Sequence, residues 1–81
     1  MELIDKKPKN KEQAKKILSI MAMTLQTIER TSNSMLLNVS GVYEVFGVDF
    51  DDEELIGVEH DLYDIMWRAK GLAKALKEKS K

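Results

Sequence analysis

Apolar side chains recur along the first half of the chain in alternating steps of four and three residues. Ser32 is the only polar member of this series. The spacing is that of a helix face paired as in a coiled coil, and a strand, whose period is two, cannot produce it. The pattern predicts one long helix over about 11–46. Its contact positions are Ala14, Leu18, Met21, Leu25, Ile28, Ser32, Met35, Val39, Val42 and Phe46.

A second series with the same spacing predicts a helix over about 52–78. Asp51 is the expected N-cap, with Glu54 three residues later and Phe50 and Leu55 in the two hydrophobic-staple positions. Acidic residues at 52–54 complement the positive end of that helix. Its contact positions are Leu55, Val58, Leu62, Ile65, Ala69, Leu72 and Leu76.

The ends and the weak points of the two helices can also be read from the sequence. Asn10 followed by Gln13 is a capping pair for the 11–46 helix. Gly47 suits a left-handed cap at its end, with Val48 against the last turn. Four poor helix formers occupy 31–34, and a kink or short break there is left open. Gly71 leaves open an earlier end of the 52–78 helix.

The short connection between the two helices makes them antiparallel neighbours. We therefore predict an all-α helical hairpin, with residues 1–9 as a mobile lead-in and 10–81 as one domain. A chain of 81 residues buries little surface, and one with no cysteine and one histidine has no disulfides or zinc site to compensate. We expect association into a dimeric four-helix bundle or a higher oligomer.

The 11–46 helix carries another series with the same spacing, next to its apolar series, and none of the residues in it is charged. Three interpretations stay open: a solvated neutral face, a close helix–helix contact in an oligomer, and a polar ligand groove. We favour the oligomer contact, because exposed helix faces are usually rich in Lys and Glu. The residues of this uncharged series are Thr24, Thr27, Thr31, Ser34, Asn38 and Gly41.

Charge is segregated along the chain although the net charge is only −1. Residues 1–16 and 68–81 hold 12 of the 13 Lys and Arg residues and four acids, whereas 17–67 hold ten acids and Arg30. A hairpin would gather the two basic stretches at its open end. Helix dipoles favour much of this pattern, but the basic end is also a candidate anion-binding surface. Its residues are Lys15, Lys16, Lys70, Lys74 and Lys77.

Two aromatic residues, Tyr63 and Trp67, lie one helical turn apart beside the second apolar series. They are either core residues or the anchor of a protein–protein contact, in which both residue types are enriched. With nearby acids they form the predicted partner surface, consisting of Glu53, Asp61, Tyr63, Asp64 and Trp67.

The sequence offers little for catalysis. It lacks a phosphate-binding glycine loop and a nucleophile placed beside a base, and His60 is the only histidine. We expect no enzyme activity, no cofactor, no metal site and no membrane span, and a cytoplasmic location. The predicted function is that of a regulator, inhibitor or adaptor that binds another protein. The alternatives are an oligomer that binds an anionic, nucleotide-like ligand in a Thr/Ser/Asn-lined pocket between subunits, and a nonspecific nucleic-acid binder using the lysine-rich end.

Overall fold

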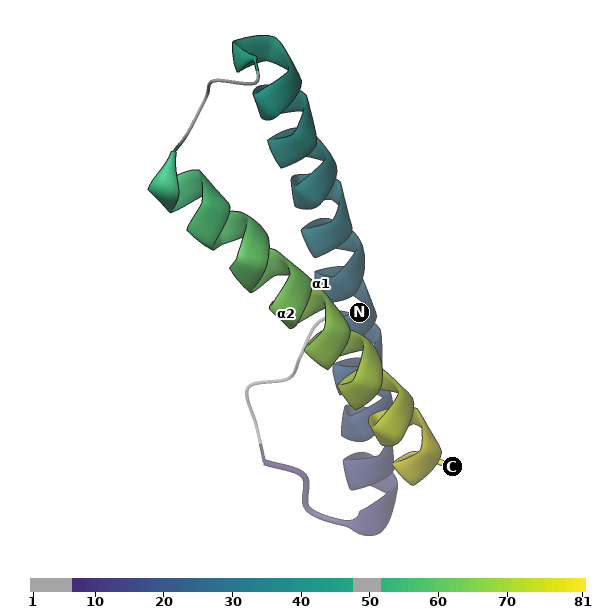
Figure 1. Cartoon of the computed structure of the whole chain (residues 1–81). Helices are drawn as coiled ribbons and strands as arrows, with labels where there is room; N and C mark the ends of the chain where they lie inside the picture. The colour runs from purple at the N-terminus through teal and green to yellow at the C-terminus, as the bar shows by residue number, and fades with distance from the viewer. Residues whose placement is uncertain (1–6, 48–51) are drawn as a thin grey trace.

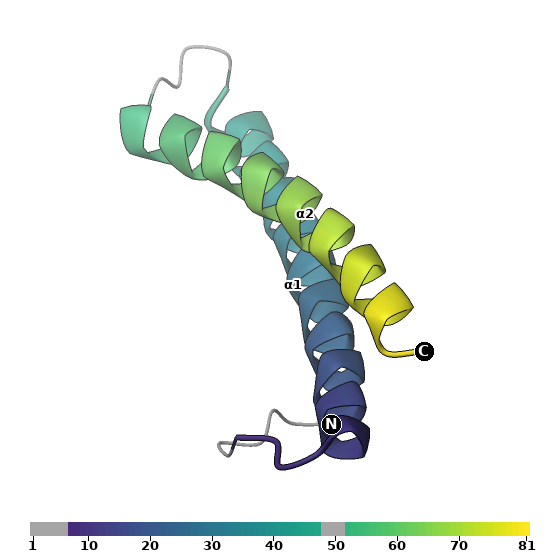
Figure 2. The same ribbon diagram turned by 90° about the horizontal axis from the view of Figure 1, so that it is seen from below.

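The computed structural model describes residues 7–47 and 52–81, and within these ranges it contains two helices and no strand. The helices are α1, Lys11–Phe46, and α2, Glu53–Lys79. They pack against each other along an elongated molecule of 56 × 22 × 17 Å. Figures 1 and 2 show them crossing, with the start of α1 and the end of α2 at the same end of the molecule. The predicted all-α antiparallel hairpin is therefore confirmed.

The start of α1 follows the predicted capping pair. The Asn10 side-chain oxygen accepts a hydrogen bond of 2.9 Å from the backbone N–H of Gln13. The Gln13 side chain in turn accepts one of 2.9 Å from the backbone N–H of Lys9. Two backbone donors that lack helical partners are satisfied in this way, which places the first turn of the helix where the sequence predicts it.

α1 then continues as one helix through 31–34 to Phe46, so no break separates two segments there. Gly47 follows with φ at +94°, a backbone conformation that side-chain-bearing residues rarely adopt. Its N–H donates a 2.9 Å hydrogen bond to the carbonyl of Tyr43. The predicted contact of Val48 with the last turn lies outside the described residues.

The predicted cap of α2 is wrong by one residue. Asp52, and not Asp51, is the N-cap, and its side-chain oxygen accepts a 2.9 Å hydrogen bond from the backbone N–H of Leu55. Two adjacent aspartates are equivalent capping groups, so local sequence does not choose between them. Asp51 and the expected staple residue Phe50 lie outside the described residues. α2 runs through Gly71 to Lys79, one residue past the predicted end.

The hydrophobic core is small. Leu36, Val39 and Leu62 form one buried cluster, and the partly buried Tyr43, Leu55 and Met66 pack against it. Leu62 of α2 thus lies level with the part of α1 between Leu36 and Val39. No large side chain in the described ranges is completely buried.

The buried face of each helix is rotated relative to the predicted series. On α1, Leu18, Leu25, Ser32 and Val39 are buried or half-buried as expected. The remaining buried or half-buried contact positions, which alternate with these, lie one residue later in the sequence than predicted. These are Ala22, Glu29, Leu36 and Tyr43 on α1, and Glu59, Met66 and Ala73 on α2.

Small side chains account for this rotation. Ala22, Ala69 and Ala73 are among the most deeply buried side chains, and an alanine at a helix contact lets the two backbones approach closely. The sequence pattern favoured the larger neighbouring residues, which the rotation leaves exposed. We call six of these the apolar side: Met21, Ile28, Met35, Val58, Ile65 and Leu72.

Candidate functional site

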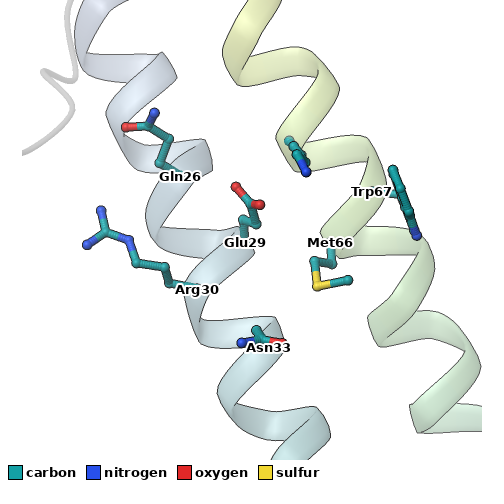
Figure 3. A pocket seen from close by; sticks show the side chains of 7 residues that line it. Gln26, Glu29, Arg30, Asn33, Met66 and Trp67 are labelled. Carbon is teal, nitrogen blue, oxygen red and sulfur yellow. The ribbon is translucent and has the colours of Figure 1, made fainter.

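A shallow groove of about 590 Å³ runs between α1 and α2, and we call it the polar groove. In Figure 3, Met66 and Glu29 point into the space between the helices, while Arg30 and Trp67 stand at the two outer edges. The lining residues are Gln26, Glu29, Arg30, Asn33, Met66, Trp67 and Lys70.

Helical spacing explains why these residues meet. Ser19, Gln26, Asn33 and Ser40 recur every seven residues on α1, which keeps them on one face of the helix next to the buried one. Tyr63 and Lys70 are likewise seven residues apart on α2. One side of the helix pair is consequently lined by amides, hydroxyls and a lysine.

The charged groups of the groove are largely exposed. Lys70 Nζ lies 5.6 Å from the centroid of the Trp67 ring, within the range of a cation–π contact. Glu29 is half-buried at a contact position of α1. On α2, Arg68 Nε lies 3.4 Å from Asp64 Oδ2, but both side chains are mostly in solvent, so this ion pair stabilises the fold by at most about 1 kcal/mol.

The lining residues include few of the side-chain types that make or break bonds, namely Glu29 and Lys70. They include one carboxylate and no serine, threonine, cysteine, histidine or tyrosine. General acid–base catalysis needs a positioned proton donor and acceptor, and covalent catalysis needs an activated nucleophile. The groove instead presents two amides, an exposed indole, a flexible thioether and charges of both signs.

The residues of the uncharged series do not line the polar groove. The Thr24 and Thr27 hydroxyls donate to the carbonyls of Ile20 and Met23, at 2.9 and 3.2 Å. Both threonines border a depression of about 240 Å³ on the surface of α1. Thr31, Ser34 and Asn38 are exposed, and Gly41 is half-buried.

The predicted partner residues are all exposed, and they do not form one patch. Trp67 has 67% of its surface in solvent and Tyr63 has 49%. Trp67 lines the polar groove, whereas Glu53 lies at the start of α2 and Asp64 pairs with Arg68. Asp61 is exposed in the third turn of α2.

Four residues of the predicted basic end lie at the same end of the molecule (Figures 1 and 2), and Lys70 lies apart from them. Lys15 and Lys16 lie near the start of α1 and Lys74 and Lys77 near the end of α2, all exposed. Lys16 borders a second pocket, of about 510 Å³, beside Pro8, Ile17 and Ile20. Lys70 belongs instead to the polar groove.

The site residues predicted from the sequence include Trp67 and Lys70 and omit the other five groove residues, which are Gln26, Glu29, Arg30, Asn33 and Met66. A signal for two of them exists in the seven-residue recurrence of Ser19, Gln26, Asn33 and Ser40. Glu29 carries no such signal, because a glutamate at a helix contact position resembles any surface glutamate in the sequence.

Residues 7–47 and 52–81 contain no cluster of three or more His, Asp or Glu side chains placed to hold a metal ion. Within the same ranges, neither helix combines the length and the apolar character needed to cross a membrane. Comparison of the chain with protein-family models, with curated proteins and with solved structures gives no match.

Proposed function

We propose that this protein is a non-enzymatic interaction protein that binds a helical segment of another protein in the polar groove and so acts as a regulator, inhibitor or adaptor. The observation that carries the proposal is the 67% exposure of Trp67 at the edge of that groove. Tryptophan offers a large amphipathic surface and is enriched among the residues that dominate binding energy at protein interfaces.

The shape of the groove supports a helical ligand. It lies between two antiparallel helices, and a third helix can pack on such a pair in the way the two pack on each other. Met66 supplies an adaptable apolar floor and Trp67 an aromatic wall. A matching helix carries apolar residues at intervals of three and four on the face that meets these two side chains.

The charges of the groove suggest what else the partner carries. An acidic side chain can pair with Lys70 and a basic one with the half-buried Glu29. The Gln26 and Asn33 amides can donate and accept hydrogen bonds along the same face. An amphipathic helix with charges of both signs fits this set of groups better than a purely acidic or basic one.

A second candidate function is binding of an anionic, nucleotide-like ligand. The observation in its favour is that Arg30, Lys70 and Trp67 line one groove, since cations bind phosphate and an indole stacks on a base. Arg30 and Trp67 stand at opposite edges in Figure 3, however, and do not converge on one point. Nucleic-acid binding through Lys15, Lys16, Lys74 and Lys77 stays a third and weaker proposal.

The test is affinity capture from native extract with the parent chain, Trp67→Ala and the control Leu37→Ala. Leu37 is a similarly exposed apolar residue, at 69%, that does not line the groove. We expect one set of retained proteins to be lost with Trp67→Ala and kept with Leu37→Ala. Retention of the same proteins by all three chains contradicts the proposal. Quenching of Trp67 fluorescence by a nucleotide at micromolar concentration would favour the second candidate.

A further inference from the structure

The apolar side is a large solvent-exposed surface formed by both helices. Its six side chains are between 37% and 55% exposed, although they are of the types that folded proteins usually bury. They are spaced seven residues apart on each helix: Met21, Ile28 and Met35 on α1, and Val58, Ile65 and Leu72 on α2. Such regular exposure indicates a second contact face beyond the one that joins α1 to α2.

The two halves of this surface lie on the same side of the helix pair. On each helix, the exposed residue directly precedes a buried or half-buried one, as Met35 precedes the buried Leu36 and Ile65 precedes the half-buried Met66. One residue turns a right-handed helix by about 100°. Because α1 and α2 run in opposite directions, the same step along both sequences turns toward the same side of the pair. The polar groove occupies the opposite side.

The antiparallel register aligns the exposed residues in pairs. Since Leu62 lies level with Leu36 and Val39, Met35 lies level with Ile65 and Ile28 with Leu72. Val58 lies level with the half-buried Val42. The Met35 and Ile65 pair is therefore the middle layer, with one pair on each side of it.

The surface area of the chain is larger than that of a compact monomer of the same mass. The chain exposes 6769 Å², whereas a compact monomer of 9.3 kDa exposes about 5,000 Å². The excess is about 1,800 Å², and a stable protein interface needs about 800 Å² from each partner. The exposed area is thus ample for one further interface.

We propose that the apolar side is covered by the apolar side of a second copy of this chain, which gives a two-fold symmetric four-helix bundle. In this bundle the long axes of the two copies run in opposite directions, and we call this arrangement head-to-tail. The two-fold axis passes at the level of Met35 and Ile65, so each of these meets its own counterpart. Leu72 then lies opposite Val58 of the second copy, and Ile28 opposite Val42. Five of the six residues, all except Met21, form a contact together with Val42 between two identical surfaces, as a two-fold interface requires.

Charge selects the head-to-tail arrangement. One end of the molecule carries Lys15, Lys16, Lys74 and Lys77, and the other carries Glu44 and Asp52 to Glu54. Head-to-tail stacking places each basic end beside an acidic one, whereas head-to-head stacking superposes like charges. On α2 it also brings Asp61 near Arg68 of the second copy, because both lie about one turn from Ile65.

The first experiment measures mass by light scattering at micromolar concentration. We expect twice the 9.3 kDa chain mass for the parent. Ile65→Lys and the milder Leu72→Gln should each raise the dissociation constant by about 30-fold or more, with helix content retained. Leu37→Lys, which alters an exposed apolar residue outside the apolar side, should leave the mass unchanged. A monomeric parent, or equal effects of all three substitutions, overturns the proposal.

The second experiment tests the orientation with single cysteines, which the cysteine-free chain permits without background. Ile65→Cys alone should form a disulfide-linked dimer on mild oxidation, because Ile65 meets its counterpart. In a head-to-head dimer Met35 would instead oppose Ile65, so only a mixture of Met35→Cys and Ile65→Cys chains would crosslink. That result, or no crosslink at either position, overturns the head-to-tail arrangement.

Dimer formation and partner binding use opposite sides of the helix pair, so the two proposals can fail separately. Loss of the dimer with Ile65→Lys does not remove the polar groove. Loss of partner capture with Trp67→Ala does not remove the apolar side. A head-to-tail dimer carries two polar grooves on its outer faces.

Discussion

Lys70 and Trp67, three residues apart on α2, lie with the lysine Nζ 5.6 Å from the centre of the indole ring. The contact covers part of an aromatic surface that is otherwise in solvent, and an exposed cation–π pair contributes about 0.5–1 kcal/mol. It also fixes Lys70 beside the polar groove, away from the lysines at the ends of the helices. The indole and the ammonium group can therefore be offered together to a partner.

Trp67 is the only tryptophan, so its fluorescence reports on the polar groove alone. We expect emission typical of a solvated indole, with strong quenching by acrylamide, at protein concentrations both above and below the dimer dissociation constant. The reason is that the apolar side and Trp67 lie on opposite sides of the helix pair. An emission maximum that moves to longer wavelength on dilution would place Trp67 in the dimer interface and contradict this arrangement.

Truncation of the core should be far more damaging than truncation of the neighbouring exposed residue. Leu62 is 6% exposed and belongs to the buried cluster with Leu36 and Val39. Leu62→Ala should lower the free energy of unfolding by about 2–5 kcal/mol, because it removes buried methyl groups and leaves a cavity. Tyr63→Ala is the matched control and should change stability by less than about 1 kcal/mol. Urea melts of the two variants that coincide would show that the core is elsewhere.

The cap of α2 can be tested with two adjacent substitutions. Asp52→Ala removes the acceptor for the Leu55 N–H and should destabilise by about 0.5–2 kcal/mol. Asp51→Ala leaves that acceptor in place and should have the smaller effect. Thermal melts compare the stabilities of the two variants directly. A larger destabilisation by Asp51→Ala than by Asp52→Ala would show that Asp51 is the N-cap.

Glycines inside and outside the helices should respond to alanine with opposite signs. At Gly57 and Gly71 an added methyl group meets nothing within 4 Å, so alanine should stabilise each helix position by about 1 kcal/mol. Gly47 has φ at +94°, and alanine there should destabilise by about 1–2 kcal/mol. Denaturant midpoints measured at one protein concentration would reveal the difference, and a stabilising Gly47→Ala would contradict the cap geometry.

Much of the backbone follows from local sequence. The Asn10 and Gln13 pair and Gly47 mark the ends of α1 by interactions within a few residues, and no tertiary contact is needed to read them. The alternating spacing of three and four likewise specifies the two helices, and the short connection between them makes them antiparallel. Leu18, Leu25 and Val39 belong to both the predicted and the observed contact series, which is why the hairpin could be predicted even though its faces were not.

The tertiary structure alone decides which face of each helix is buried. The predicted and observed series share every second position and differ by one residue at the others, so periodicity supports both. The choice depends on how closely the backbones approach at Ala22 and Ala73, which is a property of the packed pair and not of either helix. The same rotation exposes Met35 and Ile65 on one side and opens the polar groove on the other. The candidate site could not be predicted for that reason. Its residues become neighbours only when the two helices pack, and the sequence of each helix does not determine which of its faces is buried.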